Sequence, residues 1–168
     1  QVLTANIESV QNLNLVGWNI ESLEGIADFS LLKNLNCSRN ELTNLDLSQN
    51  LFLTDVSCNN NEIENLNISS LSNIINLECY NNSITELDIS NLFNLSILDC
   101  SDNNLNSLNV YNNSALIKLN CSKNSISSLD LSLNSAMEEV YLKNNNLQKI
   151  AVTNIMLISF SVYCIKVF

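Results

Sequence analysis

Hydrophobic and polar positions alternate along most of this chain in a pattern whose period is 21. The unit is clearest at residues 35–55, LNCSRNELTNLDLSQNLFLTD. Steps of 21 from Cys37 reach Cys58, Cys79, Cys100, Cys121 and then Leu142. Further apolar columns begin at Leu35, Leu42, Leu45 and Leu47. A fixed period of this length means one supersecondary unit per repeat, which buries its apolar side only by stacking on its neighbours. The pattern therefore predicts a solenoid.

Each repeat contains one clear strand signal. Leu35 and Cys37 are separated by a single polar residue, and this period-two alternation directs them inward and their neighbours outward. Stacked copies would form a parallel sheet with strands about 4.8 Å apart, and the path from strand to strand should be right-handed. We expect this sheet on the concave side, and short turns, 3-10 turns or extended segments on the convex side.

Two polar columns accompany the apolar ones. The first is asparagine in every repeat: Asn40, Asn61, Asn82, Asn103, Asn124 and Asn145. With two glycines and no proline in the chain, asparagine must serve the turns, where its amide can satisfy backbone groups. The second column is Asp46, Asn67, Asp88, Asn109 and Asp130. Its carboxylates stand on alternate coils, too far apart to share a calcium ion, so we expect it to cap turns and to bind no metal.

These residues carry a family resemblance. The segment LNCSRNELTNLDLSQN and its successors resemble the L-x-C/L-x-x-N-x-L-x-x-L-D-L pattern of short bacterial leucine-rich repeats, in particular the cysteine-ladder internalins. The resemblance covers residues 13 to about 149. It implies a leucine-rich-repeat solenoid that is secreted or displayed on the cell surface, with a role in adhesion or host interaction.

The ends of the chain depart from the repeat, and we expect one domain in three parts. Residues 1–12 form an N-terminal flank, residues 13–149 the repeats, and residues 150–168 a degenerate last repeat or a C-terminal edge. We expect Ile7 and Val10 to cover the open end of the first coil. In the tail, either Val162 and Cys164 or Phe160 and Val162 would take the strand positions.

The first coil is a variant of the unit. It matches the second coil at a spacing of 22, one more than the period, and Trp18 takes the place of the column asparagine. Residues 28–33 could form a helical turn, for which Asp28 is the expected N-cap. Polar residues interrupt the apolar tail, so we expect no transmembrane segment.

The amino-acid composition argues against several classes of function. The formal net charge of −10, from 17 acidic and seven basic residues, argues against nucleic acid, which is bound mainly through Lys and Arg. The absence of histidine removes the common nucleophile–histidine arrangements, and two glycines cannot build a phosphate loop. We therefore expect no enzyme activity and no cofactor. Five of the six cysteines are at inward positions, where a free thiol acts as a small hydrophobe, so we expect them to be reduced.

The exposed side of the predicted sheet is the remaining candidate for function. Tyrosine offers both contact area and a hydrogen bond, and the acidic residues cluster near the middle repeats. The candidate ligand-binding residues are Tyr80, Glu78, Asp99, Asn59, Asp102 and Tyr141. We expect a protein or glycan ligand, and a monomer or a dimer formed through an end of the array.

Two alternatives use the same pattern. The chain could be the recognition domain of a larger effector enzyme whose catalytic domain lies outside it. A regular serine column could instead match a lattice such as ice or a polysaccharide, although Tyr111 interrupts it: Ser48, Ser69, Ser90 and Ser132.

Overall fold

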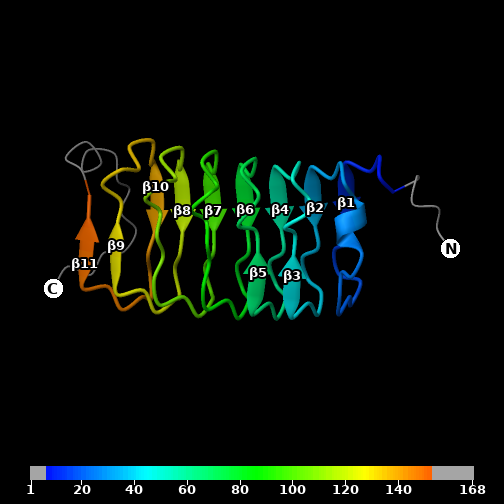
Figure 1. Ribbon diagram of the computed structural model, residues 1–168. Coiled ribbons are helices and arrows are strands. Elements are labelled where there is room, and N and C mark those ends of the chain that lie inside the picture. Colours follow the sequence, from blue (N-terminus) through cyan, green and yellow to red (C-terminus); the bar gives the residue numbers. More distant parts are fainter. Residues whose placement is uncertain (1–6, 153–168) are drawn as a thin grey trace.

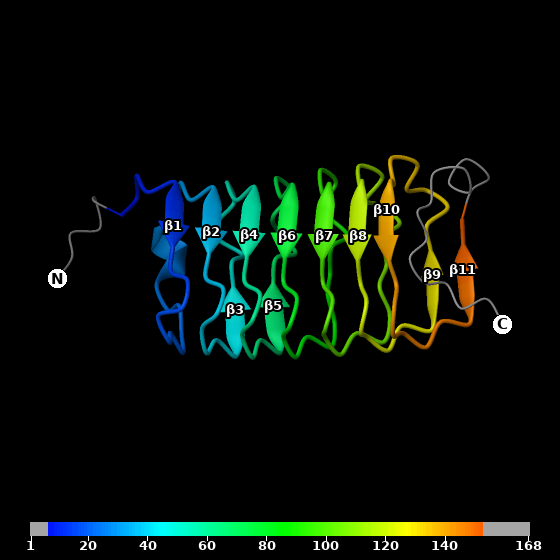
Figure 2. The ribbon, with the colours of Figure 1, turned by 180° about the vertical axis from the view of Figure 1, so that it is seen from behind.

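The computed structural model describes residues 7–152, which form a row of stacked coils (Figures 1 and 2). One strand from each coil joins a seven-stranded parallel sheet. These strands are β1 (Asn12–Asn14), β2 (Asn34–Asn36), β4 (Asp55–Ser57), β6 (Asn76–Glu78), β7 (Ile97–Asp99), β8 (Lys118–Asn120) and β10 (Glu139–Tyr141). The predicted parallel-sheet solenoid is confirmed. Each strand begins one residue before the first apolar residue of the L-x-C signal or of its equivalent, as Asn34 does before Leu35.

The register between coils follows the repeat. Leu35 pairs with Val56, and Leu77 pairs with Leu98, in each case one full period along the chain. Leu13 pairs with Leu35, which is one position more than the period, as predicted for the longer first coil. We number the coils by these strands: coil 1 is 12–33, coils 2 to 6 are the five 21-residue units from 34 to 138, and coil 7 begins at 139.

The opposite side of the coils is extended and partly hydrogen-bonded. β3 (Asn44–Asp46) pairs with β5 (Asn65–Asn67), and β9 (Ser128–Asp130) pairs with β11 (Lys149–Ala151). These strands lie in the other half of the coil from the seven-stranded sheet (Figure 1). Extended segments are predicted here from the sequence, and the pairing follows from the same alternation, because Leu45 and Leu47 are both buried.

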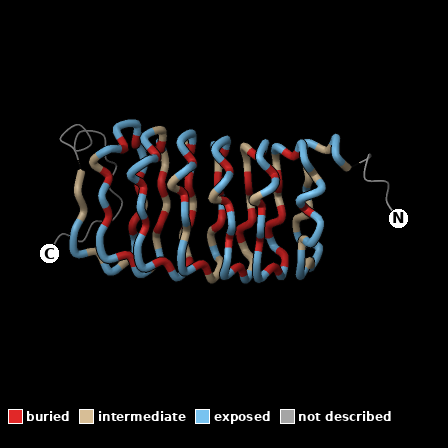
Figure 3. Tube along the Cα trace, in the orientation of Figure 1, coloured by how far each residue is buried: buried red, intermediate tan, exposed pale blue. Residues whose placement is uncertain are grey.

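The interior is a stack of apolar ladders, and their buried positions recur from coil to coil (Figure 3). The five cysteines of the repeat are free thiols and completely buried, one in each of five successive coils. Burial raises the pKa of Cys37 and Cys121 to about 12. Burial also raises the pKa values of Cys58, Cys79 and Cys100 well above the ordinary value of a thiol. The ladder is therefore an uncharged, packed element of the core.

The asparagine column binds backbone groups of its own coil and of the coil before. The Asn103 Nδ2 donates to the carbonyls of Cys79 (3.0 Å), Cys100 (3.2 Å) and Ser101 (3.2 Å), and its Oδ1 accepts from the Ile84 N–H at 3.0 Å. The same arrangement recurs at Asn61, Asn82 and Asn124. The predicted structural role of this column is confirmed.

The second polar column caps turns, as predicted. The side chains of Asp46, Asp88 and Asp130 each accept the backbone N–H two residues on, at 2.9–3.0 Å. Hydrogen bonds from the serine at that position lower the pKa of all three carboxyls. Within residues 7–152, no group of three or more cysteine, aspartate or glutamate side chains is arranged to hold a metal ion.

The first coil corrects one expectation. Its 3-10 helix η2 spans Ile26–Asp28, so Asp28 ends the helical turn instead of capping its start, and Gly25 occupies the N-cap with φ 90°. Gly25 allows this left-handed backbone, so the turn forms earlier than the Asp28 signal predicted. Val10 packs on the core as expected for an end cover. The strand positions expected at 160–164 lie outside the described residues, and no helix of the described part is long and apolar enough to cross a membrane.

A third asparagine column was not predicted. Asn50, Asn113 and Asn134 are completely buried, and the equivalent residues in coils 3 and 4 are Leu71 and Leu92. The Asn113 Nδ2 donates to the carbonyls of Ile89 and Leu92. Those two carbonyls also accept the backbone N–H groups of Leu92 and Leu95. The Oδ1 atoms of the three asparagines have no protein partner among the described residues.

Replacing Asn113 by leucine should therefore leave stability unchanged or raise it by up to about 1 kcal/mol. The carbonyls keep their backbone donors, the unpaired amide oxygen is removed, and the same site already holds leucine two coils earlier at Leu71. Urea unfolding followed by circular dichroism measures the change. A loss of more than about 1 kcal/mol would contradict this interpretation and show that the two amide bonds stabilise the fold.

Candidate binding surface

Four of the six candidate residues come together over three neighbouring strands. Glu78 on β6 is in register with Asp99 on β7. Tyr80 follows β6 by two residues and is half-buried, and Asn59 is its equivalent one coil earlier, where it is buried at 6% exposure. Glu78 is exposed and accepts the Ser57 hydroxyl at 3.1 Å. The parallel register thus places a carboxylate pair beside a tyrosine on the open side of the sheet.

Asp99 is fixed by its neighbours. One carboxylate oxygen accepts the Ser101 N–H at 3.0 Å and the Ser101 hydroxyl at 2.6 Å. The other accepts the Asn120 amide of the next coil at 3.0 Å. Three hydrogen bonds hold the carboxylate in one position, so Asp99 supports the surface as well as contributing charge to it.

Asp102 lies at the turn beside this patch. It is one of a column of residues with left-handed backbone, with φ 55°. Its carboxylate forms an ion pair with the Lys123 ammonium of the next coil at 2.7 Å. Both side chains are about half exposed, so water and salt screen the pair. The pairing partly neutralises the acidic surface that the sequence predicted here.

Tyr141 belongs to a separate cluster towards the C-terminal coils. Its hydroxyl donates to Glu139 at 3.0 Å, and the Lys118 ammonium lies 5.5 Å from the ring centre. Lys118 also pairs with Glu139 at 3.0 Å. The hydrogen bond from Lys118, followed by that from Tyr141, lowers the pKa of Glu139, and the bond to Glu139 raises the pKa of Lys118. Asn120 on β8 separates this cluster from Asp99, so the six predicted residues form two groups.

The structure adds partners that were not among the candidates predicted from the sequence. Ser57, Asn120 and Lys123 hold or neutralise candidate residues, and each lies one repeat from its partner along the chain, as Ser57 does from Glu78. The period was the signal for them, because in-register neighbours in a parallel solenoid are one repeat apart. We call Asn59, Glu78, Tyr80 and Asp99 the central patch.

A hollow lies on the other side of the coils from the central patch. It has a volume of about 480 Å³ and is lined by residues of coils 3 and 4, among them Glu64, Glu86 and Asp88. It sits beside β5, where the second sheet stops. None of the six candidate residues lines this hollow, so the predicted site and the hollow are distinct places on the molecule.

Solved structures of known proteins have a fold similar to that of this chain. No protein-family model matches the chain, and no curated protein matches it in sequence. Among solved structures, an internalin C2 from Listeria monocytogenes is 25% identical over 90% of this chain and 84% of its own, with a TM-score of 0.57. The leucine-rich-repeat protein LIC12759 from Leptospira interrogans is 24% identical over 88% of this chain and 44% of its own, with a TM-score of 0.77.

A third match concerns the cysteines. The functional domain of InlJ from Listeria monocytogenes, described as including a cysteine ladder, is 27% identical over 86% of this chain and 42% of its own, with a TM-score of 0.49. The fold assignment rests on the other two structures, whose coordinates superpose better. The chain spans less than half the length of the InlJ and LIC12759 structures. The predicted leucine-rich-repeat fold is confirmed.

Proposed function

We propose that this chain, an internalin-like leucine-rich-repeat solenoid with a cysteine ladder, is a non-catalytic scaffold that binds a protein or glycan through its seven-stranded sheet. The observation that carries the proposal is the central patch, where Glu78 and Asp99 lie in register beside Tyr80 on an open sheet. By resemblance to internalins, we place the protein outside the bacterial cell or on its surface, in adhesion or host interaction.

The composition of the sheet supports binding without chemistry. Its outward side chains are mainly asparagine, serine and acidic residues, and their hydrogen bonds run to neighbouring coils, as from Asn120 to Asp99. Side chains that are already held in place lose little freedom when a ligand binds. A tyrosine among them supplies an apolar ring with a polar tip, which is a frequent centre of recognition. This arrangement can bind and orient a ligand.

The proposal predicts that a double substitution in the central patch abolishes binding while the fold persists. We would screen the purified chain on protein and glycan arrays beside a Glu78→Ala/Tyr80→Ala variant. The side-chain contact of Glu78 is a single bond from Ser57, so we expect the variant to fold. We expect a loss of at least about tenfold in affinity for the ligand found, as for a central interface residue.

A matched control is Glu86→Ala/Tyr111→Ala, which removes one glutamate and one tyrosine from the other side of the coils, where both are exposed. It should bind like the wild type. Equal loss in both variants, or unchanged binding in the first, would contradict a ligand site at the central patch. Circular dichroism of all three proteins checks that the comparison is between folded chains.

A further inference from the structure

One edge of the solenoid is almost free of charge. We call it the return edge. It consists of the non-buried residues at three positions per coil, where the chain passes from the side that carries β3, β5, β9 and β11 back to the next strand of the seven-stranded sheet. In coils 2 to 6 these are Leu51, Phe52, Thr54, Ser72, Asn73, Ile75, Phe93, Asn94, Ser96, Ser114, Ala115, Ile117, Ser135, Ala136 and Glu138. Glu138 is the single charged residue among them, although the chain carries a net charge of −10.

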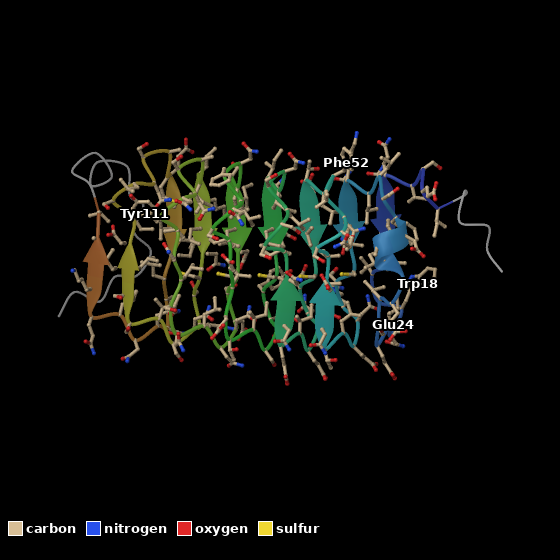
Figure 4. The ribbon with its side chains drawn as sticks, in the orientation of Figure 1. Trp18, Glu24, Phe52 and Tyr111 are labelled. Atoms are coloured by element: carbon tan, nitrogen blue, oxygen red, sulfur yellow. The ribbon has the colours of Figure 1, made fainter. Side chains whose placement is uncertain are left out.

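The return edge also exposes large apolar side chains. Leu51, Phe52, Ile75, Phe93 and Ile117 are 40–53% exposed. They are five of the ten large hydrophobic residues that are exposed in residues 7–152. Phe52 marks this edge at the top of Figure 4. Isolated apolar residues on a surface are ordinary, but a row of them along one uncharged edge is typical of a protein contact.

The two side-chain amides of the edge are already engaged within the chain. The Asn73 amide donates to the Leu51 carbonyl at 2.9 Å, and the Asn94 amide donates to the Ser72 carbonyl at 3.1 Å. Covering these donors therefore costs little, because each already has a protein partner in place of water. A sugar ligand would need free donors and acceptors in numbers, so the edge suits an apolar protein surface better.

About coil 4, the residues of coils 3 and 5 match in size, and those of coils 2 and 6 are complementary in size. Phe93 belongs to this central coil. Ile75 and Ile117 occupy the same position in coils 3 and 5, one on each side of it. The bulky pair of coil 2, Leu51 and Phe52, corresponds to the small pair of coil 6, which is Ser135 and Ala136.

We propose that the return edge binds the return edge of a second copy of this chain, antiparallel, with a two-fold axis passing at Phe93. Coil 4 then faces coil 4, coil 3 faces coil 5, and coil 2 faces coil 6. Phe93 meets the partner's Phe93, Ile75 meets the partner's Ile117, and Leu51 and Phe52 meet the small residues of coil 6. Both copies have the same coil spacing, so alignment of one pair aligns the others. Such self-complementarity is what a two-fold interface requires.

The distribution of charge also favours a second copy of this chain as the partner of the return edge. Two copies of a molecule with net charge −10 repel one another, and contact is least unfavourable where neither surface carries charge. The side of the coils that carries β3 and β5 is acidic near Glu64, Glu86 and Asp88, which disfavours contact between two copies there. The sequence led us to expect pairing through an end of the array, whereas the described residues favour this edge. Fifteen residues a side is below the roughly 20–30 of a standard interface, so the dimer should be weak.

Sedimentation equilibrium of the full chain, from about 1 µM to about 1 mM, tests the proposal. We expect a reversible monomer–dimer equilibrium that Phe93→Asp weakens at least about tenfold, because it places two carboxylates at the axis. The matched control is Trp18→Asp, which removes an apolar side chain that is 70% exposed but lies in coil 1, away from the edge. It should dimerise like the wild type. A monomer throughout, or equal behaviour of the two variants, would overturn the proposal.

Cysteine cross-linking tests the antiparallel axis separately. In a Cys164→Ser background, Phe93→Cys should form a disulfide-linked dimer under mild oxidation. Ile75→Cys and Ile117→Cys should each remain uncrosslinked alone and link when mixed. Cross-linking of Ile75→Cys with itself would mean a parallel arrangement and contradict the proposed axis. This edge is not the seven-stranded sheet, so loss of the dimer in Phe93→Asp leaves ligand binding at the central patch as an independent result.

Discussion

Replacing Asn103 by alanine is expected to destabilise the chain by about 2–4 kcal/mol. The three carbonyls that its amide binds retain other donors, namely Asn82 for Cys79, Asn124 for Cys100 and the Asn81 N–H for Ser101. The buried N–H of Ile84 has no such second partner among the described hydrogen bonds. The loss is therefore dominated by one orphaned backbone donor and the small cavity around it. Urea unfolding measures the change in the free energy of unfolding.

Two further variants separate the amide from the side-chain volume. Asn103→Asp keeps the size but places an oxygen against the three carbonyls, so it should be at least as damaging as alanine. The neighbouring Asn104 is exposed, and its backbone N–H donates to Ile84. Asn104→Ala should change stability by less than about 0.5 kcal/mol. Equal effects at positions 103 and 104 would contradict the structural role of the asparagine column.

Alkaline pH should unfold the chain through its buried thiols. In the unfolded chain a thiol titrates near 9.0, whereas burial raises the pKa of Cys37 and Cys121 to about 12 and raises the pKa of the other three well above 9.0. Above pH 9 the unfolded state releases thiol protons that the folded state retains. The stabilising contribution is complete below pH 9 and is lost as the pH rises towards 12. Each thiol contributes about 1.4 kcal/mol per pH unit, so five give a slope of about 7 kcal/mol per unit.

Stability measured in urea at small steps from pH 8 upward, over the range in which the chain is still folded without urea, tests this slope. Cys79→Leu is the informative variant, because Leu142 holds the equivalent position in coil 7. It should reduce the slope by about one fifth, and tyrosine and lysine titration cancels in the comparison with the wild type. A thiol reagent should react with the repeat cysteines only as the chain unfolds. If stability falls with pH at the same rate in both proteins, the buried thiols are not the cause of the alkaline unfolding.

The repeat period predicted most of the fold because a parallel solenoid leaves few choices. The L-x-C signal located the strands to within one residue, and the asparagine column located its own hydrogen bonds. The period also assigned the cysteines to the interior. These predictions succeeded because each repeats in at least five coils, so an error in one coil is corrected by the others.

Features without a repeating residue type were not predictable. The left-handed column includes Arg39 and Lys123 with φ 58° and 54°, residues that rarely adopt this backbone. The turn is imposed there by its neighbours in the stack. The buried amides of Asn50, Asn113 and Asn134 share their column with leucines, so polarity alone gave no signal of burial. Asp28 was misassigned because Gly25 permits an earlier turn.

The candidate site was predicted in part. The register of β6 and β7 brought Glu78, Asp99 and Tyr80 together as the strand alternation indicated, whereas Tyr141 lies two coils further on with Lys118 and Glu139. Ion pairs such as Lys123 with Asp102 depend on rotamers as well as spacing. That a ligand binds on this sheet stays a prediction.

Hydroxyl-radical footprinting with a ligand from the array screen tests the central claim most directly. Tyr80 lies in the central patch, and Tyr111 lies on the other side of the coil and is 66% exposed. We predict that the ligand protects Tyr80 from oxidation and leaves Tyr111 unchanged. Protection of Tyr111, with Tyr80 oxidised as in the free protein, would contradict binding through the seven-stranded sheet.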